Sequence, residues 1–306
     1  MYFIGIDAGG TKTAFAVGDG KRVLATVQTG SVKLGSVDEE TARKNLRDGV
    51  SQAFGAAGVA KGEIKGCCVG LSGASVPQVR EVVRTELREV LPGCEVMIVG
   101  DHVVAHRAAF PDGDGVLTVC GTGSICYGRR RGDGRELRIG GHGSVISDEG
   151  SGFWIGRECF RRLLRARDVG ESPALLQELI QRFGDGNERE LVRRANAGVF
   201  GLAELVPLVV QAAQSGDAMM SSVLQDAGGE LAGMAVEVAS RLYEPSEEVP
   251  FALVGGVAGA SQVLREAFER RMRDVFAAAE FRAERLSPVE GAVILARASS
   301  VPTGRG

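Results

Sequence analysis

Short runs of apolar residues separated by small polar turns dominate the first 30 residues. Three such runs occur in succession, and each is rich in β-branched or aromatic residues: YFIGID (2–7), TAFAVGD (13–19) and RVLATVQ (22–28). This pattern predicts three consecutive strands paired as an antiparallel meander. The loop AGGTK joins the first two strands.

From residue 37 the apolar spacing changes to that of a helix. Ser36, followed by Glu39 three residues later, predicts a capping box at its start. The chain then alternates between strands, at about 67–71 and 96–99, and helices, at about 78–90 and 101–110. Such alternation predicts a parallel extension of the same sheet.

The opening pattern returns in the second part of the chain. We expect strands at 116–120, 125–129 and 136–139, a mostly helical region at 150–245, a strand at 251–254, a helix from 261 and a last helix from Ser287. The glycine-rich stretch PDGDG (111–115) is the expected boundary. We therefore predict an N-terminal lobe of residues 1–111 and a C-terminal lobe of residues 112–306, with the last helix able to pack back on the N-terminal lobe.

Composition narrows the class of protein. The formal net charge is −3, so the chain lacks the basic field that nucleic-acid binding requires. The one dense cationic run, Arg129–Arg131, is expected at a solvated hairpin tip. No apolar run approaches the length of a membrane span and no basic leader precedes the first strand, which predicts a cytoplasmic protein without membrane association. The six cysteines form no CxxC pair, so we expect neither disulfides nor a zinc site.

The loop between the first two strands is the first candidate site. In DAGGTKT the glycines allow backbone N–H groups to approach an anion, and the polar side chains add donors. Asp7, at the strand end, could hold Mg²⁺ through water. An ordinary glycine hairpin with a capping Asp explains the same residues equally well.

A second loop of the same kind strengthens the interpretation of the first loop as an anion-binding site. GTGS (121–124) occupies the corresponding place in the second three-strand pattern, and two such loops could bind a phosphate chain together. Neither a Walker loop nor a complete GxGxxG is present, which excludes the P-loop and simple Rossmann classes.

Three further segments combine glycine with chemically active residues. Asp101 follows an apolar strand, where it could cap a helix or accept a proton from an attacking hydroxyl. In GGHG (140–143) and DEGSG (148–152), the acidic residues could bind sugar hydroxyls or cap the next helix. GGVAG (255–259) could support an adenosine on bare backbone, or serve as a plain strand-to-helix turn.

Taken together, the motifs resemble a known family. DAGGTKT, GDHVVAH, CGTGS, GGHGSVISDEGSGFWIG and LVGGVAGA, in this order, resemble the BadF/BadG/BcrA/BcrD-type ATPases and, among them, the N-acetylglucosamine kinase-like branch. The resemblance implies an α/β protein with the duplicated actin-like ATPase (ribonuclease H-like) fold, whose two lobes surround a nucleotide cleft that binds ATP and Mg²⁺.

The resemblance also implies a role for individual residues. Asp101 becomes the catalytic base, and Asp7 the residue that holds Mg²⁺. The loops that bind the ATP phosphates would comprise Gly9, Gly10, Thr11, Lys12, Thr13, Gly121, Thr122, Gly123 and Ser124. Adenosine would lie at Gly255, Gly256 and Gly259. The sugar would contact Lys33, Asp101, Gly141, His142, Gly143 and Asp148.

Two departures from the family pattern concern the sugar. Lys33 stands where N-acetylglucosamine kinases carry an Asn, and His142 stands where the vertebrate-type enzymes have a Trp. N-acetylglucosamine is the first expected substrate of this ATP-dependent kinase, with N-acetylmuramic acid and glucosamine as alternatives. Lys33 would favour a sugar that carries a carboxylate.

Two other classes of function share this fold. An ATPase activator of a radical dehydratase would need accessible cysteines for an iron–sulfur cluster, and the cysteines here lie mainly in apolar strands. A sugar-sensing regulator would need a DNA-binding module, and the core strands begin too early for one. The expected partner is a small-molecule sugar, and the expected assembly is a homodimer.

Overall fold

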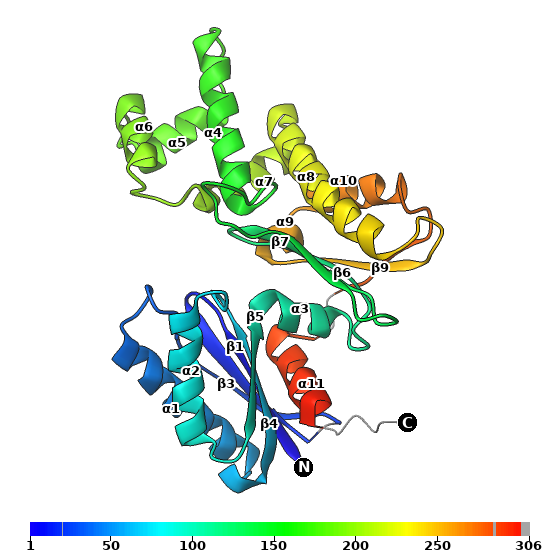
Figure 1. The fold of residues 1–306 in the computed structure, drawn as a ribbon. Coiled ribbons are helices and arrows are strands. Elements are labelled where there is room, and N and C mark those ends of the chain that lie inside the picture. Colours follow the sequence, from blue (N-terminus) through cyan, green and yellow to red (C-terminus); the bar gives the residue numbers. More distant parts are fainter. Residues whose placement is uncertain (20, 284–285, 301–306) are drawn as a thin grey trace. The chain divides into compact units, whose positions relative to one another are not determined.

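The computed structural model describes residues 1–19, 21–283 and 286–300. The chain forms two compact units (Figure 1). Unit 1 comprises Met1–Asp114 together with the C-terminal segment, and unit 2 comprises Gly115–Ala283. Residues 301–306, at the end of the expected C-terminal lobe, lie outside the described residues.

Unit 1 is built on one five-stranded sheet of order β3-β2-β1-β4-β5. Its strands are β1 (Tyr2–Ala8), β2 (Lys12–Gly18), β3 (Val23–Gly30), β4 (Ile64–Leu71) and β5 (Glu95–Gly100). The first three pair antiparallel, which confirms the meander, and β4 and β5 continue the sheet parallel to β1. The two predicted parallel strands are therefore confirmed as well.

Two pairs of helices cover the two faces of this sheet (Figure 1). The helical elements are α1 (Glu39–Ala57), the short 3-10 helix η1 (Lys61–Glu63), α2 (Pro77–Val90), α3 (Asp101–Ala109) and α11 (Pro288–Ser300). Alternate residues of β1 serve the two faces: Ile4 and Ile6 join the core under α1 and α2, whereas Phe3 joins the core under α3 and α11.

Unit 2 repeats the sheet of unit 1 with the order β10-β9-β6-β7-β8. Its strands are β6 (Gly115–Cys120), β7 (Ser124–Arg129), β8 (Glu136–Gly140), β9 (Val249–Val254) and β10 (Ala279–Phe281). Every pair has the same direction as its counterpart: β6, β7 and β8 are antiparallel, and β9 and β10 run parallel to β6. The predicted recurrence of the opening pattern is confirmed, although β10 was not predicted.

A large helical layer packs on this second sheet. Its elements are α4 (Gly152–Asp168), α5 (Ala174–Phe183), α6 (Glu188–Asn196), the 3-10 helix η2 (Leu202–Leu205), α7 (Val206–Gln214), α8 (Ala218–Leu242), α9 (Gly256–Ala260) and α10 (Gln262–Arg273). The long helix α8 contacts β6, β7 and β8 and crosses α10. At the crossing, a Cβ on Gly228 would lie 2.4 Å from the carbonyl oxygen of Leu264, so only glycine fits there.

The predicted start of the first helix is wrong by two residues. The N-cap is Asp38, whose carboxylate accepts the N–H of Thr41 at 2.8 Å. Ser36 and Val37 instead donate their N–H groups to the carbonyl of Lys33 and form a turn. Both positions offer a good capping side chain, and the chain path from β3 decides between them.

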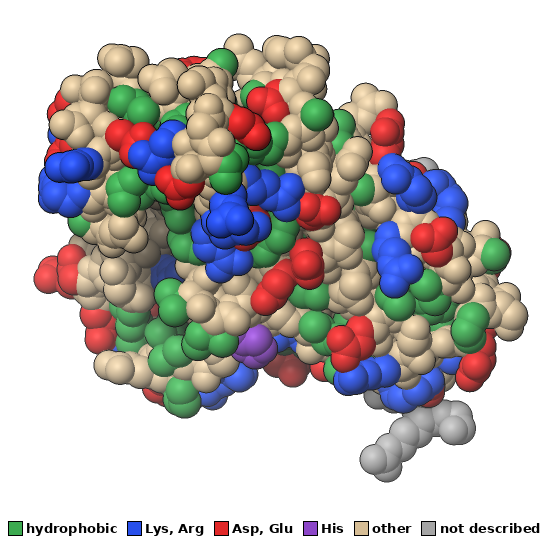
Figure 2. All heavy atoms as spheres, turned by 90° about the horizontal axis from the view of Figure 1, so that it is seen from above, with side chains coloured by type: hydrophobic (Ala, Val, Ile, Leu, Met, Phe, Trp, Pro, Cys, Tyr) green, Lys and Arg blue, Asp and Glu red, His purple; other side chains and the backbone are tan. Residues whose placement is uncertain are grey.

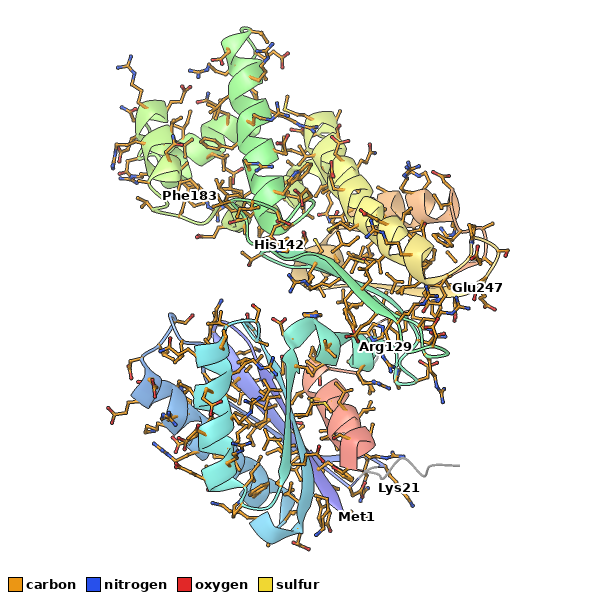
Figure 3. All side chains as sticks on the ribbon, in the orientation of Figure 1. Met1, Lys21, Arg129, His142, Phe183 and Glu247 are labelled. Atoms are coloured by element: carbon orange, nitrogen blue, oxygen red, sulfur yellow. The ribbon has the colours of Figure 1, made fainter. Side chains whose placement is uncertain are left out.

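The expected solvated tip at Arg129–Arg131 is also wrong for Arg130. Its guanidinium donates to the carbonyl of Leu242 at 2.8 Å and pairs with Glu247 at 2.9 Å. It also lies over the ring of Tyr243, 5.5 Å from the ring centre. Arg130 therefore joins the β7–β8 hairpin to the chain between α8 and β9, at the end of unit 2 where Figure 3 labels Arg129 and Glu247.

We expect the contact between α11 and β1 to be sensitive to a single methyl group. A Cβ on Gly5 would lie 2.5 Å from the main-chain oxygen of Val289 and from the main-chain nitrogen of Val293. Gly5→Ala should therefore lower the free energy of unfolding by about 1–3 kcal/mol, because backbone cannot give way as a side chain can. Urea unfolding measures the change.

Gly62→Ala is the matched control in the same unit. Its Cβ would meet nothing within 4 Å. Equal unfolding midpoints for the two variants would show that the main chain of α11 does not pack closely against Gly5 of β1.

Candidate functional site

Two carboxylates of unit 1 lie at one edge of its sheet. Asp7 is next to the last residue of β1, and Asp101 follows β5 directly as the first residue of α3. Since β1, β4 and β5 are parallel, their carboxyl ends share this edge. Alternation places Asp7 on the same face as Gly5, the face that α3 and α11 cover. In open α/β sheets, ligands bind at the carboxyl ends of the strands.

The two carboxylates differ in their electrostatic state. Burial and, to a smaller extent, the negative charge of Asp101 raise the pKa of Asp7 to about 6, while Lys12 opposes the rise. The His102 side chain holds the pKa of Asp101 below its usual value. The His102 Nδ1 lies 3.6 Å from Asp101 Oδ1, and its backbone N–H donates to the same oxygen at 2.9 Å. Asp101 is therefore ionised at neutral pH, whereas the pKa of the neighbouring Asp7 lies close to neutral pH.

The first glycine loop exposes most of its predicted members. Gly9 donates its N–H to the carbonyl of Lys12 at 3.1 Å, which closes the turn. Gly10, Thr11 and Lys12 are exposed. Thr13 is fully buried, and its hydroxyl has no hydrogen-bond partner in the described parts of the chain. The accessible groups of the loop are therefore two glycines, the Thr11 hydroxyl and the Lys12 amine, whereas the Thr13 hydroxyl is inaccessible.

Lys33 lies in the turn after β3. Its N–H donates to the hydroxyl of Ser31 at 3.0 Å, and the Ser31 hydroxyl lies 3.3 Å from the carbonyl oxygen of Gly9. This chain of bonds connects the Lys33 turn to the first glycine loop. Among the residues that the structure describes, no carboxylate pairs with the amine of Lys33, a residue of intermediate burial.

The second glycine loop is tied to the start of α4. Gly152 donates its N–H to the carbonyl of Gly121 at 2.8 Å, and Phe153 does the same to Thr122 at 3.1 Å. The buried Ser124 donates its hydroxyl to the carbonyl of Glu149 at 2.7 Å. The loop is therefore held in one shape, and the Ser124 hydroxyl is already engaged within the protein.

Asp148 is fixed against this loop in a strained conformation. It is only 7% exposed and has a φ of 69°. Its carboxylate lies over Gly123, where a Cβ would be 2.7 Å from Oδ2. Burial raises the pKa of this carboxyl, while the N–H groups of Ser124 and Gly143 lower it. Strained backbone of this kind is concentrated at binding and catalytic sites.

The loop that carries His142 is shaped by glycine. Gly140, Gly141 and Gly143 have φ values of 77°, 71° and 94°, which other residues rarely adopt. His142 is exposed and lies beyond the end of β8 (Figure 3). The predicted sugar-contacting residues of unit 2 therefore lie on one short segment that begins and ends beside the second loop.

A pocket of about 620 Å³ adjoins the same loop within unit 2. Gly121 and Thr122 line one part of it, and Gly256 at the start of α9 lines another. Gly255 has a φ of 108°, and a Cβ there would lie 2.4 Å from the carbonyl oxygen of Cys120, so it shapes the turn into α9. Gly259 is exposed but does not line this pocket.

The third wall of the pocket comes from α7, which the sequence did not reveal. The residues that contribute are Val206, Pro207, Val210, Gln211 and Gln214. They recur at helical spacing, so the signal was present.

Outside these loops, the described residues show mixed surface charge and thiols that are mostly buried. Cationic and anionic side chains are interspersed on the face shown in Figure 2. All six cysteines are free; five are buried and Cys94 is partly buried. Within residues 1–19, 21–283 and 286–300, no cluster of three His, Cys, Asp or Glu could hold a metal. None of the helices in that part of the chain has the length and apolarity to cross a membrane.

Comparison with known proteins places the chain among sugar kinases. It is 27% identical to an N-acetylmuramic acid/N-acetylglucosamine kinase of Clostridium acetobutylicum, over 97% of this chain and 98% of the relative. It is 29% identical to an N-acetyl-D-glucosamine kinase of Dictyostelium discoideum, over 96% of this chain and 97% of the relative.

A solved structure supports the same grouping. The protein designated an N-acetylglucosamine kinase from Chromobacterium violaceum matches with a TM-score of 0.75 and 25% identity, covering 96% of this chain and 98% of the other. The predicted actin-like ATPase fold is thereby confirmed. A model of the BadF/BadG/BcrA/BcrD ATPase family matches residues 4–296, and the chain therefore belongs to that family.

Proposed function

We propose that this protein is an ATP-dependent kinase that transfers the γ-phosphate to a hydroxyl of an amino sugar, with N-acetylglucosamine as the first substrate. The observation that carries the proposal is the ionised Asp101 at the carboxyl edge of β5, beside Asp7 at the same edge. The names of the full-length relatives support the class of substrate.

Asp101 would act on the attacking hydroxyl. Its carboxylate accepts the hydroxyl proton while the sugar oxygen forms a bond to the γ-phosphorus and the bond to the bridging oxygen of ADP breaks. A depressed pKa suits this task, because phosphoryl transfer depends more on positioning and charge stabilisation than on a strong base.

Asp7 fits a role in holding Mg²⁺. Burial and the charge of Asp101 raise the pKa of Asp7, and a nearby cation would offset both effects. Mg²⁺ uses one or two protein carboxylates plus water and phosphate oxygens. When bound, the ion would neutralise the charge that develops on the transferred phosphate.

In each unit, the accessible part of the glycine loop would bind phosphate oxygens. The exposed or partly exposed residues are Gly9, Gly10, Thr11 and Lys12 in unit 1 and Gly121, Thr122 and Gly123 in unit 2. Thr13 and Ser124 would shape the loops rather than donate their hydroxyls, since one is buried and the other is bound to Glu149. Adenosine would occupy the pocket beside Gly256.

The sugar would contact the glycine-shaped segment of unit 2. Gly141, His142, Gly143 and the fixed carboxylate of Asp148 supply donors and acceptors for hydroxyl groups. We further propose that the enzyme is a cytoplasmic homodimer.

Replacing Asp101 should separate chemistry from binding. Asp101→Asn keeps the shape but cannot accept the proton, so kcat should fall by about 10²–10⁴-fold. The dissociation constant for ATP should change by less than about threefold. A coupled ADP-release assay and calorimetry give the two values.

Asp112→Asn is the control, because Asp112 is an exposed acid of the same unit. Retention of most activity in Asp101→Asn would refute the assigned role.

Asp7→Asn should stabilise the metal-free protein at neutral pH while it lowers activity. The pKa of Asp7 rises from 3.8 to about 6 on folding, so the ionised carboxylate opposes the native state above pH 6. The variant should gain about 1–3 kcal/mol at pH 7. The gain should shrink as the pH falls through 6 and vanish below 3.8, where both states are protonated. Thermal unfolding in a chelator at pH 7 and pH 3.5 measures it.

A loss of stability at pH 7 would mean that Asp7 is bound favourably within the apo-protein. It would then be a structural residue.

Lys33→Ala tests which amino sugar is preferred. The amine has no carboxylate partner among the described residues and could bind an acidic sugar. The kcat/KM for N-acetylmuramate relative to N-acetylglucosamine should fall at least about tenfold. An unchanged ratio contradicts the role, and Lys61→Ala, at an exposed lysine of the same unit, is the control.

A further inference from the structure

The side of α7 that faces the pocket combines apolar and amide side chains. Val206, Val210 and Gln214 follow one another at intervals of four residues, and Pro207 and Gln211 lie beside them. The two valines are 5% and 8% exposed, whereas both glutamines are exposed. This helix therefore gives the pocket an apolar wall with an amide rim.

The opposite wall is short and apolar. Val257 and Ala260 of α9 line it, and Thr122 stands where the pocket meets the second glycine loop. The volume of about 620 Å³ lies within the range of small-molecule sites. Two apolar walls beside a phosphate-binding loop suit a flat aromatic base, and a purine fills such a space better than a pyrimidine because it buries more apolar area.

Each polar side chain of the pocket can both donate and accept hydrogen bonds. These side chains are Thr122, Gln211 and Gln214. A hydroxyl and an amide each donate and accept, and an amide can turn by 180° to exchange its oxygen and nitrogen. Adenine presents an amino donor at its six-position where guanine presents a carbonyl acceptor, and a turning amide serves either one.

The main chain of α7 adds little discrimination. Its internal N–H and C=O groups are bonded within the helix, and carbonyls near its end accept from the residues that follow. Ser215 donates to Gln211 and Ala212, and Gly216 donates to Ala213. Base selection by this wall therefore depends on the two glutamine side chains.

We infer that the pocket is a purine site without strong preference between adenine and guanine, in which Gln211 and Gln214 contact the edge of the base. The inference rests on the proposed nucleotide-dependent function and extends it to the class of nucleotide. The enzyme should use GTP as well as ATP, and it should use pyrimidine nucleotides poorly.

Direct binding tests this inference independently of sugar turnover. Calorimetry on the full chain with ATP, GTP and CTP should give dissociation constants for the two purines within about tenfold of each other. CTP should bind at least about tenfold more weakly than either. A preference above about 100-fold for one purine, or tight binding of CTP, would overturn the inference.

Variants whose side chains can only accept hydrogen bonds test whether Gln211 and Gln214 contact the base. Gln211→Glu and Gln214→Glu accept but no longer donate, so at least one should shift the ATP-to-GTP affinity ratio at least about tenfold towards ATP. The added negative charge repels both triphosphates alike, and the ratio therefore removes that effect. Gln225→Glu, an exposed glutamine of α8 outside the pocket, is the control and should leave the ratio unchanged. If both variants behave like the control, the glutamines do not contact the base.

The kinase assay distinguishes failure of the proposed kinase function from failure of the inferred purine site. If both purines bind as expected but no amino sugar is phosphorylated with either, the proposed function fails while the purine site stands. If N-acetylglucosamine is phosphorylated with ATP alone and GTP does not bind, the proposed function stands and the inference fails.

Discussion

Parallel pairing of β1, β4 and β5 sets the position of both acidic groups of unit 1. Each strand ends at the same edge, and hydrogen-bonded pairing spaces neighbouring strands by about 4.8 Å. Asp7 and Asp101, separated by one intervening strand, are thus close enough for their charges to interact. The part of the Asp7 pKa shift that comes from Asp101 follows from that register, and so does the proposed attraction of this edge for a cation.

Unit 2 uses the same sheet order but stabilises its loop differently. The second glycine loop is bonded to the first turn of α4, and Asp148 fits over it only because residue 123 is glycine. The neighbouring pocket extends this rigid surface to α7 and α9. A loop that is ordered before its ligand arrives loses little conformational entropy on binding, which favours affinity for a flexible phosphate chain.

The sequence was sufficient for the sheets, for their repetition and for most helices, because strand periodicity and glycine turns are local signals. The loops around Gly9 and Gly121 and the position of Asp101 at a helix start followed from the same signals. The burial of Thr13 was not predicted, since it depends on the packing of a whole face. Arg130 was misread because its partners lie more than 100 residues away. The α7 wall was missed because both sides of that helix carry apolar residues, and only the fold shows which side remains open.

The packing of α11 against β1 also bears on how the chain is made. Gly5 and Gly66, on neighbouring strands of the first sheet, leave room for main-chain atoms of a helix that begins at residue 288. During synthesis, the sheet of unit 1 emerges first, but the face that α3 covers in part stays incomplete until α11 has left the ribosome. Unit 2, whose described elements lie within one continuous segment, can be complete before then. Of the two units, unit 1 is therefore the later to finish folding, and the part of its apolar face that α11 covers needs protection from aggregation in the meantime.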